Sequence, residues 1–178
     1  MAIAISGWFD RSAELSIRTV WKKMAESGVD ETLHHGPYRP HVTLGIWNDL
    51  TVDDAVALTK VVASRCGPVR VQFEVVGMFV HPEAAVFLAP TVSFELRTLH
   101  ERVHNAAQQT LAVPFDYHIP GCWNPHCTLA WNLAPEALSR AVTVALAAVS
   151  LPLTATINQI GIIETPAEIV HNSFPLID

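Results

Sequence analysis

Two short segments of the chain share the pattern Pro-His-x-Thr-Leu, which places an imidazole two residues before a hydroxyl group. The segments occupy residues 40–44 and 125–129, so about half the chain length separates them. Roughly 0.004 matches to this pattern are expected by chance in a chain of this composition. Each segment also follows a proline-rich loop and opens a predicted strand. The two matches therefore indicate a shared function rather than coincidence.

The spacing within each segment suits a strand, because residues i and i+2 of a strand point to the same face. His41 and Thr43 would therefore lie side by side, and so would His126 and Thr128. The residue between them and the leucine that follows would point to the opposite face and pack. If the two strands come together, two imidazoles and two hydroxyl groups surround a space that fits a phosphate.

These four side chains have the properties that phosphodiester cleavage requires. Free imidazole has a pKa near roughly 6.5, so one ring can be neutral while the other is protonated. We assign His126 as the base that takes a proton from water and His41 as the acid that protonates the leaving oxygen, although the near-symmetry allows these roles to exchange. Thr43 and Thr128 would donate hydrogen bonds to the non-bridging oxygens. This chemistry requires neither a metal nor a cofactor.

At these residues the chain resembles the 2H phosphoesterase superfamily, whose signature is two H-x-[ST] motifs with apolar flanks. Within that superfamily it is most similar to the 2′-5′ RNA ligase and cyclic phosphodiesterase branch. The positions that match the family pattern one by one are His41, Thr43, His126 and Thr128. Some members that act on nucleic acids carry a basic residue shortly after the second motif, whereas this chain has Ala130-Trp131.

The resemblance implies an α+β fold of two pseudo-symmetric lobes, with mainly antiparallel sheets lining a central cleft and helices outside. We expect one domain over residues 1–178 that contains both lobes. The implied activity is a cyclic phosphodiesterase that opens a 2′,3′-cyclic nucleotide or a related small cyclic phosphate, including an RNA end. A 2′-5′ RNA ligase-like activity is the alternative outcome.

Residues beside the two motifs are candidates for substrate binding. Tyr38 and Arg39 precede the first motif, and Trp123 precedes the second. An aromatic ring can stack on a base, and a guanidinium can pair with phosphate. Packing on the loops is the competing interpretation. Trp47 follows His41 by six residues, so regular alternation would place it on the histidine face, although we favour a core position.

A different motif suggests a different enzyme. His100, Glu101 and His104 match H-E-x-x-H on a predicted helix, where the two imidazoles could bind zinc and the carboxylate could act as a base. Arg102 places a cation inside the motif, and the extended metallopeptidase pattern is absent because residues 107 and 110 are Ala and Thr. A third ligand would have to be Glu136 or Glu164. A non-catalytic nucleotide-binding module is a further alternative.

Composition limits the partners. Eleven Lys and Arg residues stand against seventeen Asp and Glu residues, giving a net charge of −6. A protein that follows a long phosphate backbone usually carries a basic face, so we expect a small nucleotide or RNA terminus and no extended nucleic-acid surface. The first residues lack the features of a signal peptide, and three cysteines predict no disulfide framework. We expect a cytoplasmic monomer without a membrane segment.

Hydrophobic periodicity and capping residues predict alternating helices and strands. In chain order, strands are expected at 2–9, 41–47, 69–80, 84–89, 126–133, 153–163 and 169–176, and helices at 11–27, 52–65, 91–112 and 135–150. In two similar series, a helix leads through a proline-rich loop into a histidine-bearing strand. This repetition predicts two related lobes.

Overall fold

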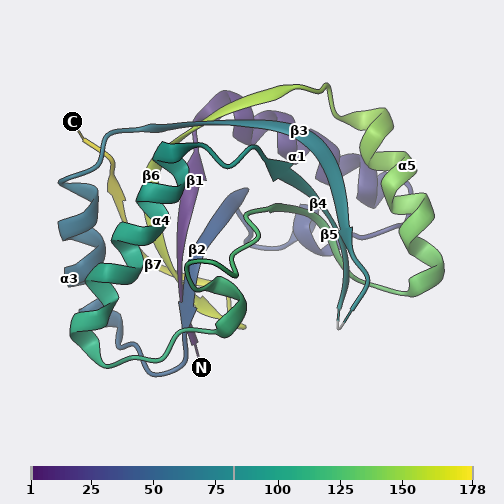
Figure 1. The fold of residues 1–178 in the computed structure, drawn as a ribbon. Coiled ribbons are helices and arrows are strands. Elements are labelled where there is room, and N and C mark those ends of the chain that lie inside the picture. The colour runs from purple at the N-terminus through teal and green to yellow at the C-terminus, as the bar shows by residue number, and fades with distance from the viewer. Residues whose placement is uncertain (1, 82, 178) are drawn as a thin grey trace.

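The fold is an antiparallel sheet covered by helices (Figure 1), seen in a computed structural model that describes residues 2–81 and 83–177. The strands are β1 (Ala2–Phe9), β2 (His41–Trp47), β3 (Val69–Phe79), β4 (Ala84–Pro90), β5 (Cys127–Leu133), β6 (Leu153–Thr165) and β7 (Ile169–Pro175). The helices are α1 (Arg11–Glu26), α2 (Thr32–His35), α3 (Val52–Ala63), α4 (Phe94–Ala107) and α5 (Leu138–Ala148). The α+β class is as predicted.

Two long strands join the halves of the molecule. The strand order is β2-β1-β6-β3-β4-β5, and β7 also pairs with β6. The first part of β6 pairs with the first part of β3, while the rest of β6 pairs with β1 and β7. The far part of β3 pairs with β4. The strands of the two lobes therefore belong to one hydrogen-bonded sheet, and β2 and β5 stand at its two ends.

Each lobe takes its helices from both parts of the chain. Helices α3 and α4 lie together over the lobe that contains β1, β2 and β7, whereas α1 and α5 cover the lobe that contains β4 and β5 (Figure 1). Helix α1 follows β1 in sequence but contacts β5, and α4 follows β4 but contacts β2. The motif strand of each lobe is therefore covered by a helix that follows a strand of the other lobe.

Side-chain caps set the starts of three helices. The Asp10 carboxylate accepts hydrogen bonds from the first-turn amides of α1, the Thr51 hydroxyl caps α3, and the Ser93 hydroxyl caps α4. The helix predicted over 91–112 therefore begins only after Ser93, and it ends at Ala107, where a 3₁₀ turn (Gln108–Thr110) follows. Within the described residues, no helix is long and apolar enough to cross a membrane.

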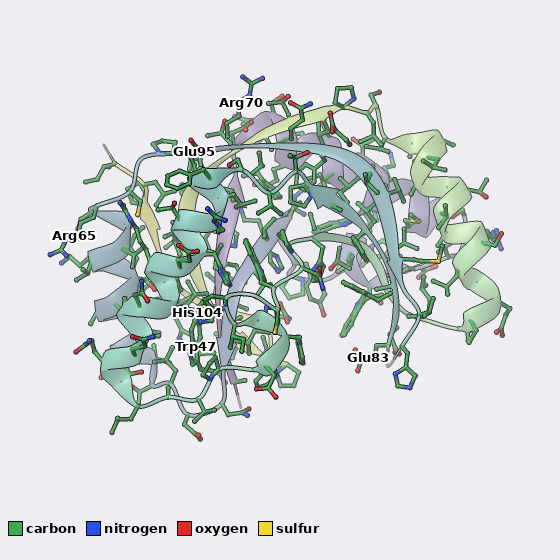
Figure 2. All side chains as sticks on the ribbon, viewed as in Figure 1. Trp47, Arg65, Arg70, Glu83, Glu95 and His104 are labelled. Carbon is green, nitrogen blue, oxygen red and sulfur yellow. The ribbon has the colours of Figure 1, made fainter. Side chains whose placement is uncertain are left out.

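The core between sheet and helices contains three histidines, of which two lie on the buried face of α4. His100 is 1% exposed and its Nε2–H donates to the His118 carbonyl oxygen at 2.7 Å. His104 is 6% exposed and donates to the Leu44 carbonyl oxygen at 3.1 Å. Figure 2 shows His104 beside Trp47 of β2. These bonds connect α4 to the strand that carries the first motif and to the loop before the second.

Burial lowers the pKa of each of these histidines, because the charged form loses its water. The pKa falls to about 4 for His100 and for His118. The His118 Nδ1 has no hydrogen-bond partner among the described residues. All three rings are therefore neutral at neutral pH.

Protonation of this cluster should destabilise the fold in acid. The folded-state pKa lies below the unfolded value, so the stability is present above pH 6.5 and is lost as pH falls towards 4. We expect His100 and His118 each to contribute about 3 kcal/mol to this loss. His118→Phe removes one titrating group, so its unfolding free energy, measured by urea denaturation, should fall less steeply between pH 6.5 and 4. Equal slopes for the variant and the wild type would contradict the assignment.

Candidate active site

The two motifs have the same arrangement of exposed and buried side chains. His41 and Thr43 are half-buried at the start of β2, and His126 and Thr128 are half-buried around the start of β5. The residue between each pair and the leucine that follows are at most 1% exposed and lie in the core. The i, i+2 spacing therefore presents one imidazole and one hydroxyl on the same side of each strand, as the sequence predicts.

Both motif strands contain a β-bulge directly after the threonine. The pairing of β2 with β1 skips Leu44, and the pairing of β5 with β4 skips Leu129. A bulge adds one residue to a strand and reverses the alternation beyond it, and bulges are common beside active sites. This reversal explains why Trp47 lies in the core at 1% exposure rather than on the face of His41.

The structure brings the two motifs together. Strands β2 and β5 contact each other, although they end the strand order. The charge of His126 acts on His41 and contributes to lowering its pKa. Burial raises the pKa of the Cys127 thiol to about 12, and the backbone N–H of His41, which faces that sulfur, acts in the opposite direction. The residue after the second histidine thus contacts the backbone of the first.

Both imidazoles are held through the same ring nitrogen. The His41 Nδ1 lies 2.7 Å from the Arg39 carbonyl oxygen, and the His126 Nδ1 lies 2.8 Å from the Asn124 carbonyl oxygen. A carbonyl oxygen only accepts hydrogen bonds, so each Nδ1 carries a proton. In the neutral ring, Nε2 is then the basic atom, and in the protonated ring Nε2–H is the donor. Each histidine therefore presents its Nε2 for proton transfer.

The surroundings of both rings favour the neutral state. Burial is the largest cause that lowers the pKa of His41, the bond to the Arg39 carbonyl partly opposes it, and the nearby His126 lowers it further. Burial also lowers the pKa of His126, against the opposing effect of the Asn124 carbonyl. Both rings can therefore act as bases near neutral pH, and a negative charge placed between them would favour the protonated form of one.

Aromatic rings surround His126 on the side of β3 and β4. The Phe79 ring meets the imidazole edge to face at 5.0 Å between centroids, and the Phe87 ring lies 5.3 Å away. The two phenylalanine rings are 4.3 Å apart. Phe87 is also the cross-strand partner of Thr128. These contacts restrict the orientation of the His126 ring.

Arg39, a predicted phosphate contact, belongs to a polar network beside the first motif. Its Nε pairs with the Glu14 carboxylate at 2.9 Å, and its Nη1 donates to the Gln159 side-chain oxygen at 3.2 Å. The guanidinium lies over the Trp8 ring, 4.6 Å from its centroid. Partial burial opposes ionisation of Glu14, but hydrogen bonds from Arg18 and Arg39 outweigh it and lower the pKa of Glu14. The charge of Arg39 is thus partly neutralised.

Tyr38 and Trp123, the other two predicted contacts, are both half-buried. The Tyr38 carbonyl oxygen accepts a hydrogen bond from Arg18 at 3.0 Å. The Trp123 indole N–H donates to the Thr43 carbonyl oxygen at 2.9 Å, and one face of its ring stacks on His100 with a centroid distance of 3.9 Å. Trp123 therefore contacts the first motif, although it precedes the second in sequence.

The H-E-x-x-H segment has a different geometry from a zinc site. The Nε2 atoms of His100 and His104 bond to backbone carbonyls, whereas Glu101 is exposed and lies 3.7 Å from Arg97. Among residues 2–81 and 83–177, no group of three or more His, Cys, Asp or Glu side chains is placed to hold a metal ion. The motif therefore contributes buried anchors rather than a ligand set.

Sequence reasoning missed several residues near the motifs. The Trp21 indole N–H donates to the Thr128 carbonyl oxygen at 2.9 Å, the charge of His126 acts on His118, and Phe79 and Phe87 pack on His126. A sequence signal exists only for Phe79 and Phe87, which lie on the predicted strands 69–80 and 84–89. The contact of Trp21 joins residues 107 positions apart, and nothing in the local pattern of α1 indicates it.

A known protein family matches most of the chain. The family model for the 2′-5′ RNA ligase superfamily matches residues 48–167, which is about two-thirds of the chain. The match includes the second motif and begins just after the first. No curated protein matches the sequence significantly.

Solved structures share the fold at low sequence identity. The protein TT0787 of Thermus thermophilus is 17% identical with a TM-score of 0.66, over 99% of this chain and 98% of that chain. Escherichia coli LigT complexed with 3′-AMP is 13% identical, with the same TM-score and the same coverage. Kluyveromyces marxianus Usb1 with uridine monophosphate is 12% identical with a TM-score of 0.55, over 98% of both chains. Given the family match over most of its length, the chain belongs to the 2′-5′ RNA ligase superfamily of 2H phosphoesterases.

Proposed function

We propose that this protein is a metal-independent phosphodiesterase that opens small cyclic phosphodiesters, with a 2′,3′-cyclic nucleotide or a cyclic-ended RNA terminus as the substrate class. One observation carries the proposal. Two histidines from opposite halves of the chain lie at the starts of strands that contact each other, and the charge of His126 acts on His41. Each histidine binds a backbone carbonyl through Nδ1, which makes Nε2 the basic nitrogen of the neutral ring.

In the proposed reaction, the neutral His126 Nε2 takes a proton from water as the oxygen attacks phosphorus. The bond from phosphorus to one ring oxygen breaks, and the protonated His41 donates its Nε2 proton to that leaving oxygen. The Thr43 and Thr128 hydroxyls donate hydrogen bonds to the non-bridging oxygens, where charge accumulates. The product is a phosphomonoester, and the proton states of the two histidines are exchanged at the end.

The charge of the protein supports a small substrate. The net charge is −6, and Arg39 beside the first motif is already paired with Glu14. A local site can still hold one phosphate with the threonine hydroxyls and one imidazolium. The solved relatives include complexes with 3′-AMP, NADP+, phosphate and uridine monophosphate, which supports a nucleotide-like ligand of this size.

RNA ligation is the second candidate, and the family to which the chain belongs favours it. With a 5′-hydroxyl in place of water, the same acid–base pair would join the two RNA ends. The 5′ oxygen attacks phosphorus and gives its proton to the base, the bond from phosphorus to the 3′ oxygen breaks, and the acid protonates that leaving oxygen, so a 2′-5′ linkage remains. A cyclic-ended RNA should therefore be assayed with and without a 5′-hydroxyl RNA. A ligated product that forms faster than the hydrolysed one would favour the ligase.

Replacing either motif histidine should abolish most of the activity. We expect His41→Ala and His126→Ala each to lower kcat on 2′,3′-cyclic nucleotides about 100- to 10,000-fold, because each removes one proton-transfer group. Melting temperatures should show that both variants fold. His171→Ala is the control, since this histidine pairs with Glu164 on the β6–β7 hairpin and should leave kcat unchanged. Near-normal turnover in both motif variants would exclude the mechanism, and complete loss of wild-type activity in EDTA would favour a metal enzyme.

The pH dependence of kcat/KM should be bell-shaped, with its maximum below pH 6.5. One histidine must be neutral and the other protonated, and the surroundings lower the pKa of both from the ordinary value of 6.5. The two apparent pKa values belong to the coupled pair. The kcat profile, which reports the complex, should lie at higher pH because the bound phosphate favours a protonated imidazole. A kcat/KM maximum above pH 7 would contradict this assignment.

A further inference from the structure

Two tryptophans contact the motifs in matching ways. The Trp21 indole N–H donates to the Thr128 carbonyl oxygen at 2.9 Å, and the Trp123 indole N–H donates to the Thr43 carbonyl oxygen at 2.9 Å. Both acceptors are the backbone oxygens of the motif threonines. Trp21 comes from the first half of the chain and holds the second motif, and Trp123 comes from the second half and holds the first.

We propose that Trp21 and Trp123 are positioning residues, which set the placement of the two threonine hydroxyls through these backbone hydrogen bonds. This inference rests on the proposed function, since the threonines are the groups that would contact the phosphate. Neither indole needs to reach the substrate.

The motif strands need such support at this point. Strands β2 and β5 are at the two ends of the strand order, so each pairs with only one neighbouring strand of the sheet. The bulges at Leu44 and Leu129 interrupt that ladder immediately after each threonine. Without another constraint, the backbone around Thr43 and Thr128 would be the least restrained part of each strand.

The two indoles are themselves fixed. Trp21 is 3% exposed within the core. The Trp123 ring lies parallel to the His100 ring, at 3.9 Å and an interplanar angle of 5°, and His100 is bound to the His118 carbonyl oxygen. His100 of α4 thus holds the Trp123 indole that contacts the first motif. The H-E-x-x-H segment therefore has a structural role that requires no metal. A donor held this rigidly can fix the threonine within the small tolerance that catalysis requires.

Trp→Phe variants test the proposal, because phenylalanine keeps an aromatic ring and removes the N–H. We expect Trp21→Phe and Trp123→Phe each to lower kcat on a 2′,3′-cyclic nucleotide about tenfold, with KM nearly unchanged. Trp131→Phe is the matched control, since Trp131 is 38% exposed and should change neither constant. A core variant with an equal loss of melting temperature, such as Ile17→Val, should also keep kcat.

Double-mutant cycles separate positioning from general packing. In the Thr43→Ala background, Trp123→Phe should have little further effect on kcat, and Trp21→Phe should retain its full effect. In the Thr128→Ala background, the dependence should be reversed. Additive effects within the matched pairs, or equal coupling in the crossed pairs, would overturn the inference.

A separate measurement distinguishes failure of this inference from failure of the proposed function. If the wild type is inactive on every cyclic nucleotide, the proposed function fails, and indole hydrogen exchange measured by NMR still tests the contacts. The indole protons of Trp21 and Trp123 should exchange slowly, that of Trp131 should exchange fast, and the amide signals of Thr43 should shift in Trp123→Phe. Fast exchange at the indoles of both Trp21 and Trp123 would overturn the proposal whatever the activity.

Discussion

The site depends on one constraint, which is that strands from opposite ends of a single sheet must touch. The strand order places β2 and β5 as far apart as the sheet allows, yet they are in contact. Strands β3 and β6 make this contact possible because they span both lobes. They pair with each other at their first residues, and further along β6 pairs with β1 whereas β3 pairs with β4. The right-handed twist that accumulates over such long strands turns one lobe relative to the other.

The crossed helices maintain this arrangement. Helix α1 reaches β5 and α4 reaches β2, so neither lobe can bury its motif strand with helices of its own half alone. Trp21 of α1 and His104 of α4 lie at these contacts, and both donate hydrogen bonds to backbone carbonyls of the motif strands. A displacement of one lobe would leave buried carbonyls without donors, which is unfavourable. The relative position of the two histidines is therefore coupled to the burial of the core.

Local pattern was sufficient for the strands, for four of the helices and for the motifs, but it did not predict the short helix α2. Alternation on a strand correctly predicted which side of each motif is buried, and capping residues together with hydrophobic periodicity correctly predicted the starts of α1 and α3. Tertiary pairing decided the rest. A bulge exists only relative to a partner strand, so the reversal that moves Trp47 into the core could not be read from alternation. The contact of Trp21 with Thr128 has no local signal for the same reason.

The H-E-x-x-H segment shows how a correct geometric prediction can support the wrong chemistry. The spacing does place His100 and His104 on one helix face, with rings 4.5 Å apart. That face is buried, however, and each Nε2 donates its proton to a carbonyl oxygen. A nitrogen that carries a proton has no lone pair for a metal, and the exposed Glu101 lies 3.7 Å from Arg97. The environment of the face, rather than the spacing, decides what the two imidazoles do.

Burial lowers the pKa of the core histidines and of the motif histidines alike, but the two sets bind the backbone through different ring nitrogens. In the core, it lowers the pKa of His100 and His118 to about 4, so these rings stay neutral, and the His100 ring donates from Nε2 to the His118 carbonyl oxygen. At the motifs, burial also lowers the pKa of His41 and His126, and each of these rings donates to a carbonyl oxygen through Nδ1. An anionic phosphate between the two rings would stabilise an imidazolium, so one ring would take up a proton when the phosphate binds. Substrate binding would thereby make one histidine an acid and leave the other a base. Because the net charge of the chain is −6, the attraction for phosphate would have to come from the site itself.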